Sequence, residues 1–161
     1  MNAVERVRPP KGPYRIINRI MRWMLSRPNR AQRIGRHVML LHVTGRRTGR
    51  QIVFPVAYRS ADDGRLLVLT NSPWRVNLRG NPAVAVTLLG ERRPARAELV
   101  EDPASVAKIY SAVIEDLGYA KAGRRMGIRI NVPRPPTPDE LAEAARRDGL
   151  AAVYLDVSAG G

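Results

Sequence analysis

The chain has 161 residues, of which 44% are hydrophobic, so it is long and apolar enough to form one globular domain around a core. It contains no cysteine and no apolar run of about 18 residues, which excludes a disulfide framework, a thiolate metal site and a membrane-spanning helix. The formal net charge of +14 leaves nucleic acid, anionic membranes and acidic small molecules as candidate partners.

The positive charge is concentrated near the N-terminus. Residues 1–50 contain thirteen of the 28 basic residues and a single acid, Glu5. The N-terminus lacks the apolar core of a secretory signal, so we expect a cytoplasmic protein. Nucleic acid is a poor candidate partner, because aromatic residues make up only 5% of the chain and do not alternate with the arginines as a base-stacking surface would.

Two segments precede the predicted sheet. Residues 1–13 are rich in proline and are expected to form a flexible basic arm. Residues 14–27 carry isoleucine and methionine at helical spacing with arginines on the other side, which predicts an amphipathic helix. We favour packing of its apolar face on the rest of the protein or on a second subunit, which would give a homodimer. The alternative is peripheral contact with an anionic membrane, and the protein would then be membrane-associated.

The strongest functional signal lies in the hairpin predicted over residues 38–58. Residues 38–43 and 51–58 are predicted strands, and the turn between them, residues 44–50, combines two glycines and two threonines with three arginines. Guanidinium groups bind phosphate or carboxylate through paired hydrogen bonds, and exposed turn amides form a concave site for the same charge. The turn therefore predicts an anion receptor. The alternative is an ordinary solvated hairpin turn.

The rest of the chain alternates hairpins with a few helices. Apolar alternation and turn residues predict further strands over residues 65–70, 83–89, 92–100 and 150–157, and helical turns over residues 74–79. Helices are predicted from capping signals at Asp102 and Thr137, whereas residues 119–136 are predicted to be irregular. This order indicates a mainly β fold with flanking helices (α+β), built as a small antiparallel barrel in one domain.

Few side chains suit catalysis on their own. The two histidines, His37 and His42, have no second ligand at metal spacing, so we expect local hydrogen bonds for each and no metal site. The basic turn is neither a Walker A loop, which needs Gly-Lys-Ser/Thr, nor a dinucleotide fingerprint, which needs a β-α-β unit. An enzyme built this way would need a bound cofactor to supply its chemistry.

Two segments resemble the deazaflavin-dependent nitroreductase family of the flavin/deazaflavin oxidoreductase superfamily. The first is Thr44-Gly45-Arg46-Arg47-Thr48-Gly49, followed by Pro55 and Tyr58. The second is Trp74 with Asn77-Leu78-Arg79, followed by Asn81-Pro82 and Val84. The resemblance covers residues 40–100. It implies a split β-barrel, FMN-binding-like fold, with residues 37–161 as the cofactor-binding domain.

The resemblance also implies an oxidoreductase that passes hydride from coenzyme F-420, an 8-hydroxy-5-deazaflavin, to a nitroaromatic, a quinone or an activated double bond. The cofactor would be held by Gly45, Arg46, Arg47, Thr48, Gly49, Arg50, Pro55, Trp74 and Asn77. The arginines would hold its phosphate and acidic tail, while Pro55 and the turn from Trp74 to Asn77 would line its ring. By the same analogy, Tyr119 would donate the matching proton or close the pocket.

Two alternatives remain open. FMN is an alternative cofactor, because the glycine-rich segment before the family tryptophan is reduced here to Asn71-Ser72-Pro73, and Ile52 and Phe54 occupy positions that are often polar. The same fold without chemistry would be a basic binding module for a carried cofactor, an anionic lipid or nucleic acid.

Overall fold

The computed structural model describes residues 2–7 and 38–157. These residues divide into two compact units. One contains residues 2–7, 69–73 and 99–153, and the other contains residues 38–68, 74–98 and 154–157. This division was not anticipated by the prediction of a single domain. The predicted helix over residues 14–27, the arm beyond residue 7 and His37 lie outside the described residues, so these predictions remain predictions.

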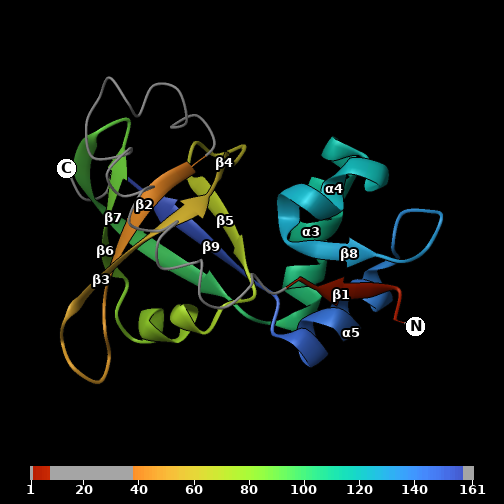
Figure 1. Cartoon of the computed structure of the whole chain (residues 1–161), viewed down its shortest axis with the longest axis horizontal. Coiled ribbons are helices and arrows are strands. Elements are labelled where there is room, and N and C mark those ends of the chain that lie inside the picture. Colours follow the sequence, from red (N-terminus) through yellow and green to blue (C-terminus); the bar gives the residue numbers. More distant parts are fainter. Residues whose placement is uncertain (1, 8–37, 158–161) are drawn as a thin grey trace. The chain divides into compact units, whose positions relative to one another are not determined.

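A seven-stranded sheet makes up most of the β structure (Figure 1). Its strand order is β3-β2-β6-β7-β9-β5-β4. The strands are β2 Val38–Thr44, β3 Gln51–Ala57, β4 Arg59–Ser60, β5 Leu66–Thr70, β6 Ala83–Leu88, β7 Glu91–Val100 and β9 Ala151–Asp156. The pairings of β2 with β3 and β6, of β6 with β7, and of β4 with β5 are all antiparallel. The sheet forms a half-barrel, so the predicted mainly antiparallel fold with flanking helices is confirmed.

The register of the β2–β3 hairpin is fixed by burial. Met39, Leu41 and Val43 alternate along one face of β2, and each is at most 1% exposed. On that face Leu41 lies opposite Phe54 of β3 and Val86 of β6. Leu40 and His42 on the other face are also buried, at 4% and 8% exposed, so a slip of one residue would exchange two sets of buried side chains that differ in size and polarity. The hairpin turn is therefore held at a defined place at the end of the sheet.

The unit that contains residues 2–7, 69–73 and 99–153 includes three helices and a two-stranded sheet. We call it the helical unit. Its elements are β1 Val4–Arg6, α3 Pro103–Leu117, α4 Tyr119–Met126, β8 Ile128–Ile130 and α5 Pro138–Asp148. The Asp102 carboxylate accepts a hydrogen bond from the backbone N–H of Ser105 at 3.0 Å and so caps α3. Thr137 and Glu140 form the capping box that begins α5. Both predicted helix starts are confirmed. No helix among the described residues is long and apolar enough to cross a membrane.

Two predictions for this unit are wrong. Residues 2–7 are not a flexible arm, because β1 pairs with β8 and Val4 is only 1% exposed. Residues 119–136 are not irregular throughout, since they contain α4 and β8. The apolar signal of α4 is short: Ala122 and Met126 are its buried residues, and basic residues lie between them. A strand of three residues gives an even weaker pattern, and only its pairing partner makes it stable.

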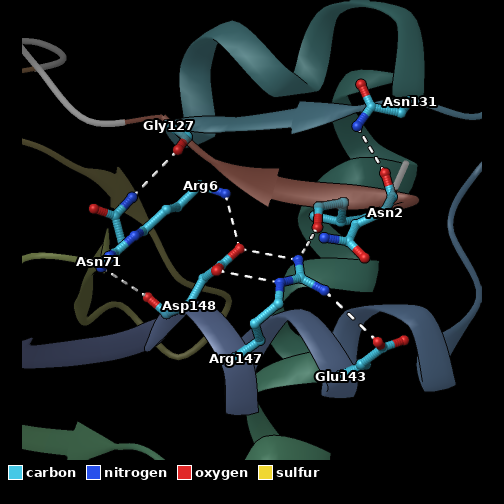
Figure 2. A network of polar contacts seen from close by, with 9 residues as sticks. Asn2, Arg6, Asn71, Gly127, Asn131, Glu143, Arg147 and Asp148 are labelled. Carbon is cyan, nitrogen blue, oxygen red and sulfur yellow. Dashed lines mark hydrogen bonds and ion pairs between the residues drawn. The ribbon is translucent and has the colours of Figure 1, made fainter.

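A polar network attaches β1 to α5 (Figure 2). The Asp148 carboxylate accepts from the backbone N–H of Arg6 at 3.1 Å and from the Arg147 guanidinium at 3.0 Å. The Arg6 guanidinium donates to the backbone carbonyl of Asp148 at 3.3 Å, and Arg147 also donates to the carbonyl of Val4. The Asp148 side chain is 16% exposed, so these bonds are partly shielded from water. One carboxylate thus satisfies both backbone and side-chain donors and holds the first strand to the helix.

We predict that Asp148→Ala lowers the free energy of unfolding by about 1 to 3 kcal/mol, because it leaves the Arg6 amide and the Arg147 guanidinium without their charged acceptor. Urea titration followed by circular dichroism measures the change. Glu143→Ala is the control, since its carboxylate lies 3.7 Å from Arg147 and is 66% exposed. An exposed pair of this kind contributes about 0.5 kcal/mol or less. Equal losses in the two variants would contradict the role of Asp148.

Candidate functional site

The turn between β2 and β3 is closed by its own hydrogen bonds. The N–H of Gly45 donates to the Arg50 carbonyl at 2.8 Å, and the N–H of Gly49 donates to the Gly45 carbonyl at 2.9 Å. The N–H of Arg50 donates to Thr48 Oγ1 at 3.2 Å. Gly49 has a φ of 69°, a left-handed conformation that glycine adopts at no steric cost. The turn therefore has a defined shape within the protein alone.

This turn carries cationic groups that have no partner in the described part of the chain. Arg46, Arg47 and Arg50 are exposed, and no described carboxylate pairs with their guanidinium groups. The backbone N–H groups of Arg47 and Thr48 also have no acceptor among the described residues. By contrast, the Arg65 guanidinium is held by two carboxylates. Unpaired guanidinium groups and amides on one turn are the components of an anion receptor.

Asn77 connects the turn to the 3₁₀ helix η1, Pro73–Leu78. Its Oδ1 accepts from the backbone N–H of Arg46 at 3.0 Å, and its Nδ2 donates to the carbonyl of Trp74 at 2.9 Å. The partners fix the orientation of the amide, because one is a donor and the other an acceptor. The segment around Trp74, which is distant in sequence, is therefore attached to the basic turn.

An aromatic pair continues the site away from the turn. The rings of Phe54 and Trp74 have centroids 4.9 Å apart and planes inclined at 48°. Both side chains are partly exposed, and Ile52, on the same face of β3 as Phe54, is 40% exposed. We call Ile52, Phe54 and Trp74 the apolar strip. A Cβ added to Gly45 would lie 3.5 Å from Ile52 Cδ1, so the apolar strip begins at the turn.

The structure brings together most of the predicted cofactor-binding residues. The turn, Asn77 and Trp74 are joined by the contacts described above. Pro55 is adjacent to Phe54 in β3, so its ring lies on the opposite face of the strand, opposite Leu40 of β2. It therefore does not share a face with the aromatic pair. Phe54 lies on the face of Trp74 instead, as its even spacing from Ile52 in the sequence indicates, and the predicted contact of Pro55 with the cofactor stays a prediction.

Tyr119 belongs to the other compact unit. It is the first residue of α4 and is 37% exposed. Its hydroxyl donates to the carbonyl of Pro133 at 3.3 Å. The predicted proton donor is thus an accessible phenol with a hydrogen bond within its own unit.

His42 is buried in β2. Its Nε2 lies 2.7 Å from Thr87 Oγ1, which confirms the predicted local hydrogen bond for this ring nitrogen. Nδ1 has no partner among the described residues. Burial, together with the positive charge of Arg92, lowers the pKa of His42 and so favours the neutral ring. Within residues 2–7 and 38–157, no group of three His, Cys, Asp or Glu side chains could hold a metal ion.

The two units differ in charge. The described residues of the unit that contains the basic turn include ten arginines and five acids, whereas those of the other unit include nine basic and nine acidic residues. The excess positive charge of the described chain therefore belongs to the unit with the turn. Such a field raises the local concentration of an acidic ligand and speeds its encounter with the protein.

Comparison with known families decides the class of the protein. The sequence model of the F-420H(2)-dependent quinone reductase family matches residues 15–133, about three quarters of the chain. The chain belongs to this family. It is an oxidoreductase that uses coenzyme F-420, so the predicted enzyme class and cofactor are confirmed. The family relation suggested by the two sequence segments is confirmed as well.

Solved structures show weaker similarity. An F-420 reductase is 18% identical over 84% of this chain and 90% of its own, with a TM-score of 0.40. An F-420-H2 dependent reductase is 17% identical over 74% of this chain and 94% of its own, with a TM-score of 0.42. A pyridoxamine 5′-phosphate oxidase-related, FMN binding protein from Nostoc punctiforme is 14% identical over 92% and 83%, with a TM-score of 0.48. No curated protein matches the chain significantly.

We predict that Arg47→Ala weakens binding of coenzyme F-420 by about ten- to a hundred-fold, because each charged hydrogen bond contributes about 1.5 to 3 kcal/mol. The free energy of unfolding should change by about 0.5 kcal/mol or less, since the side chain is exposed on a turn. Fluorescence titration and urea unfolding measure the two quantities. Arg96→Ala is the matched control, an exposed arginine of β7 in the same unit. A similar loss of cofactor affinity in both variants would indicate that Arg47 acts through the overall positive potential of the unit and not through a direct contact.

Proposed function

We propose that the β2–β3 turn binds the phosphate and acidic tail of coenzyme F-420, and that the protein reduces a quinone. The observation that carries the first part is a closed turn, attached through Asn77 to a partly exposed aromatic pair, whose three guanidinium groups have no partner among residues 2–7 and 38–157. Coenzyme F-420 has a flat ring at one end and a phosphate with glutamates at the other. A cationic turn that continues into an apolar strip matches both ends.

Each part of the turn has a physical role in this proposal. Arg46, Arg47 and Arg50 bind the phosphate and carboxylates through charged hydrogen bonds, and the N–H groups of Arg47 and Thr48 add neutral donors. Gly49 supplies the left-handed residue that the turn needs. Gly45 packs closely, because a Cβ there would lie 3.2 Å from Thr48 Oγ1 and 3.3 Å from the Arg50 carbonyl. Larger residues at Gly45 would push these atoms apart and change the shape of the turn.

The apolar strip orients the flat part of the ligand. Phe54 and Trp74 present ring surface, and Ile52 extends it towards the turn. Stacking on these side chains removes water from one side of a bound ring, which also strengthens the charged contacts nearby. When bound, reduced coenzyme F-420 supplies the hydride for the reaction. The chain's own contribution is to bind, to orient and to exclude water.

The acceptor class rests on the description of the family, which is that of a quinone reductase. A quinone suits the site chemically, because a flat, mostly apolar acceptor can approach an apolar strip without loss of hydrogen bonds. Nitroaromatics and activated double bonds share that shape and are the competing acceptors.

We predict that the protein oxidises reduced coenzyme F-420 faster with a soluble quinone than with a nitroaromatic or an activated alkene of similar size. The loss of cofactor absorbance under oxygen-free conditions measures the three rates. The protein with Arg47→Ala should need about ten- to a hundred-fold more cofactor for half-maximal rate with every acceptor. A higher rate with the nitroaromatic would contradict the quinone assignment without affecting the cofactor site. Equal or tighter binding of FMN would contradict the preference of the site for coenzyme F-420.

Reduction of a quinone by hydride also requires a proton, and we propose the Tyr119 hydroxyl as its donor. Tyr119→Phe removes this hydroxyl and its bond to the Pro133 carbonyl. We predict a fall in turnover of at least about 100-fold, which is typical of a lost general acid, with cofactor affinity unchanged. Single-turnover rates and a cofactor titration test this. Unchanged turnover would remove Tyr119 from the mechanism and leave the acceptor and the anion site in place.

Three further expectations from the sequence stay proposals. They are a homodimer contact, a peripheral membrane contact through residues 14–27, and a cytoplasmic location. A deletion that tests the segment should begin after residue 7, because β1 pairs with β8 and buries Val4. Otherwise a loss of stability in the helical unit would be confused with a loss of the contact.

A further inference from the structure

Asn77 has both ends of its side-chain amide engaged within the protein. The family resemblance implies that it lines the cofactor ring, but its two bonds go to the Arg46 N–H and the Trp74 carbonyl. We propose that Asn77 is a positioning residue that holds the basic turn in place relative to Trp74 before the cofactor binds. This inference rests on the proposed function, because it assigns the assembly of that same site to one side chain.

The direction of the turn depends on an attachment outside the turn. Its internal bonds, from Gly45 to Arg50 and from Gly49 to Gly45, fix its shape. They do not fix its tilt, because all of these bonds lie within the turn and its residues are exposed from Arg46 onwards. The bond from the Arg46 N–H to Asn77 joins the turn to a segment 31 residues later in the chain. It therefore restrains the direction in which the three guanidinium groups are presented.

The other end of the Asn77 amide is bound within η1. Asn77 Nδ2 donates to the Trp74 carbonyl three residues earlier, within η1. The ring of the same tryptophan packs on Phe54, which belongs to the strand that leaves the turn. The hairpin thus holds η1 at two points, through the Asn77 amide and through the Trp74 ring. Breaking the first point frees the turn to move relative to the apolar strip.

The residue type supports this role. Asparagine carries an acceptor and a donor on one short side chain, and both are used here. Aspartate would keep the acceptor for Arg46 but lose the donor for Trp74, and it would place a negative charge beside a turn that binds anions. Alanine would remove both bonds. A turn that is already held in its binding geometry increases affinity, because no conformational entropy is lost in ordering it when the ligand binds.

The alternative role is direct contact with the cofactor ring. Oδ1 has a second lone pair and Nδ2 a second hydrogen, so the amide retains one acceptor and one donor for a ligand. Direct contact and positioning differ in what the loss of Asn77 does to the protein without ligand. They also differ in which part of the cofactor the loss affects.

The first test uses the full chain without cofactor. Amide hydrogen exchange of Arg46, followed by NMR, should become about 2- to 12-fold faster in Asn77→Ala, the factor expected for loss of one hydrogen bond. Asn77→Asp, which keeps the acceptor, should exchange more slowly than Asn77→Ala. The control is Asn81→Ala, an exposed asparagine shortly after η1. Unchanged exchange in Asn77→Ala would overturn the positioning role whatever the cofactor does.

The second test compares coenzyme F-420 with a fragment that has the deazaflavin ring but lacks the phosphate and glutamates. Asn77→Ala should weaken binding of the full cofactor by about 2- to 12-fold and leave the fragment within about 2-fold. In an Arg47→Ala background, Asn77→Ala should have little further effect, because the contact that it presets is gone. Equal weakening of cofactor and fragment, with additive effects of the two substitutions, would show direct ring contact instead.

These outcomes separate the inference from the proposed function. If Arg47→Ala binds the full cofactor like the parent, the anion site is wrong, and the exchange of the Arg46 amide still decides whether Asn77 holds the turn. If Arg47→Ala weakens binding while Asn77→Ala changes neither exchange nor affinity, the anion site stands and the positioning role is overturned.

Discussion

The antiparallel pairing of β2 with β3 is the constraint on which the candidate site depends. The alternation of a β-strand puts Ile52 and Phe54 on one face of β3 and Pro55 on the other, and the register sets Phe54 opposite the buried Leu41 and Pro55 opposite Leu40. The turn closes the same hairpin, so its arginines and the apolar strip belong to one continuous piece of backbone. The pairing of β2 with β3 therefore places the charged turn and the apolar strip next to each other.

The arginines of the turn differ in their ion pairing from Arg65 and Arg134. Arg65 is held by Asp63 and Glu98, and Arg134 forms paired bonds with Glu140, so these cations are used to join segments. The arginines of the turn have no such partner among residues 2–7 and 38–157. Leaving an exposed guanidinium unpaired costs little, because water solvates it well. It also leaves the full strength of a charged hydrogen bond available for an anionic ligand.

In the helical unit, polar contacts hold a short strand, β1, in place. Its N-terminal strand has only three residues, too few to be stable without partners. Pairing with β8, burial of Val4 and the carboxylate of Asp148 together hold it in place (Figure 2). The charges of this unit balance one another, in contrast to the unit with the turn. Polar groups here stabilise the fold, whereas in the turn they remain available for binding.

The sequence by itself determined the features that depend on local chemistry. Helix caps at Asp102 and Thr137, the hairpin with its arginine-rich turn, and the two segments that resemble a deazaflavin enzyme all follow from residues close together in the chain. The tertiary structure alone decided the features that depend on distant partners. Such features are the strand at Val4, the packing of Phe54 against Trp74, and the engagement of Asn77 by Arg46 rather than by solvent. A short strand has no periodicity to detect, and a side-chain amide shows its role only when both of its partners are in place.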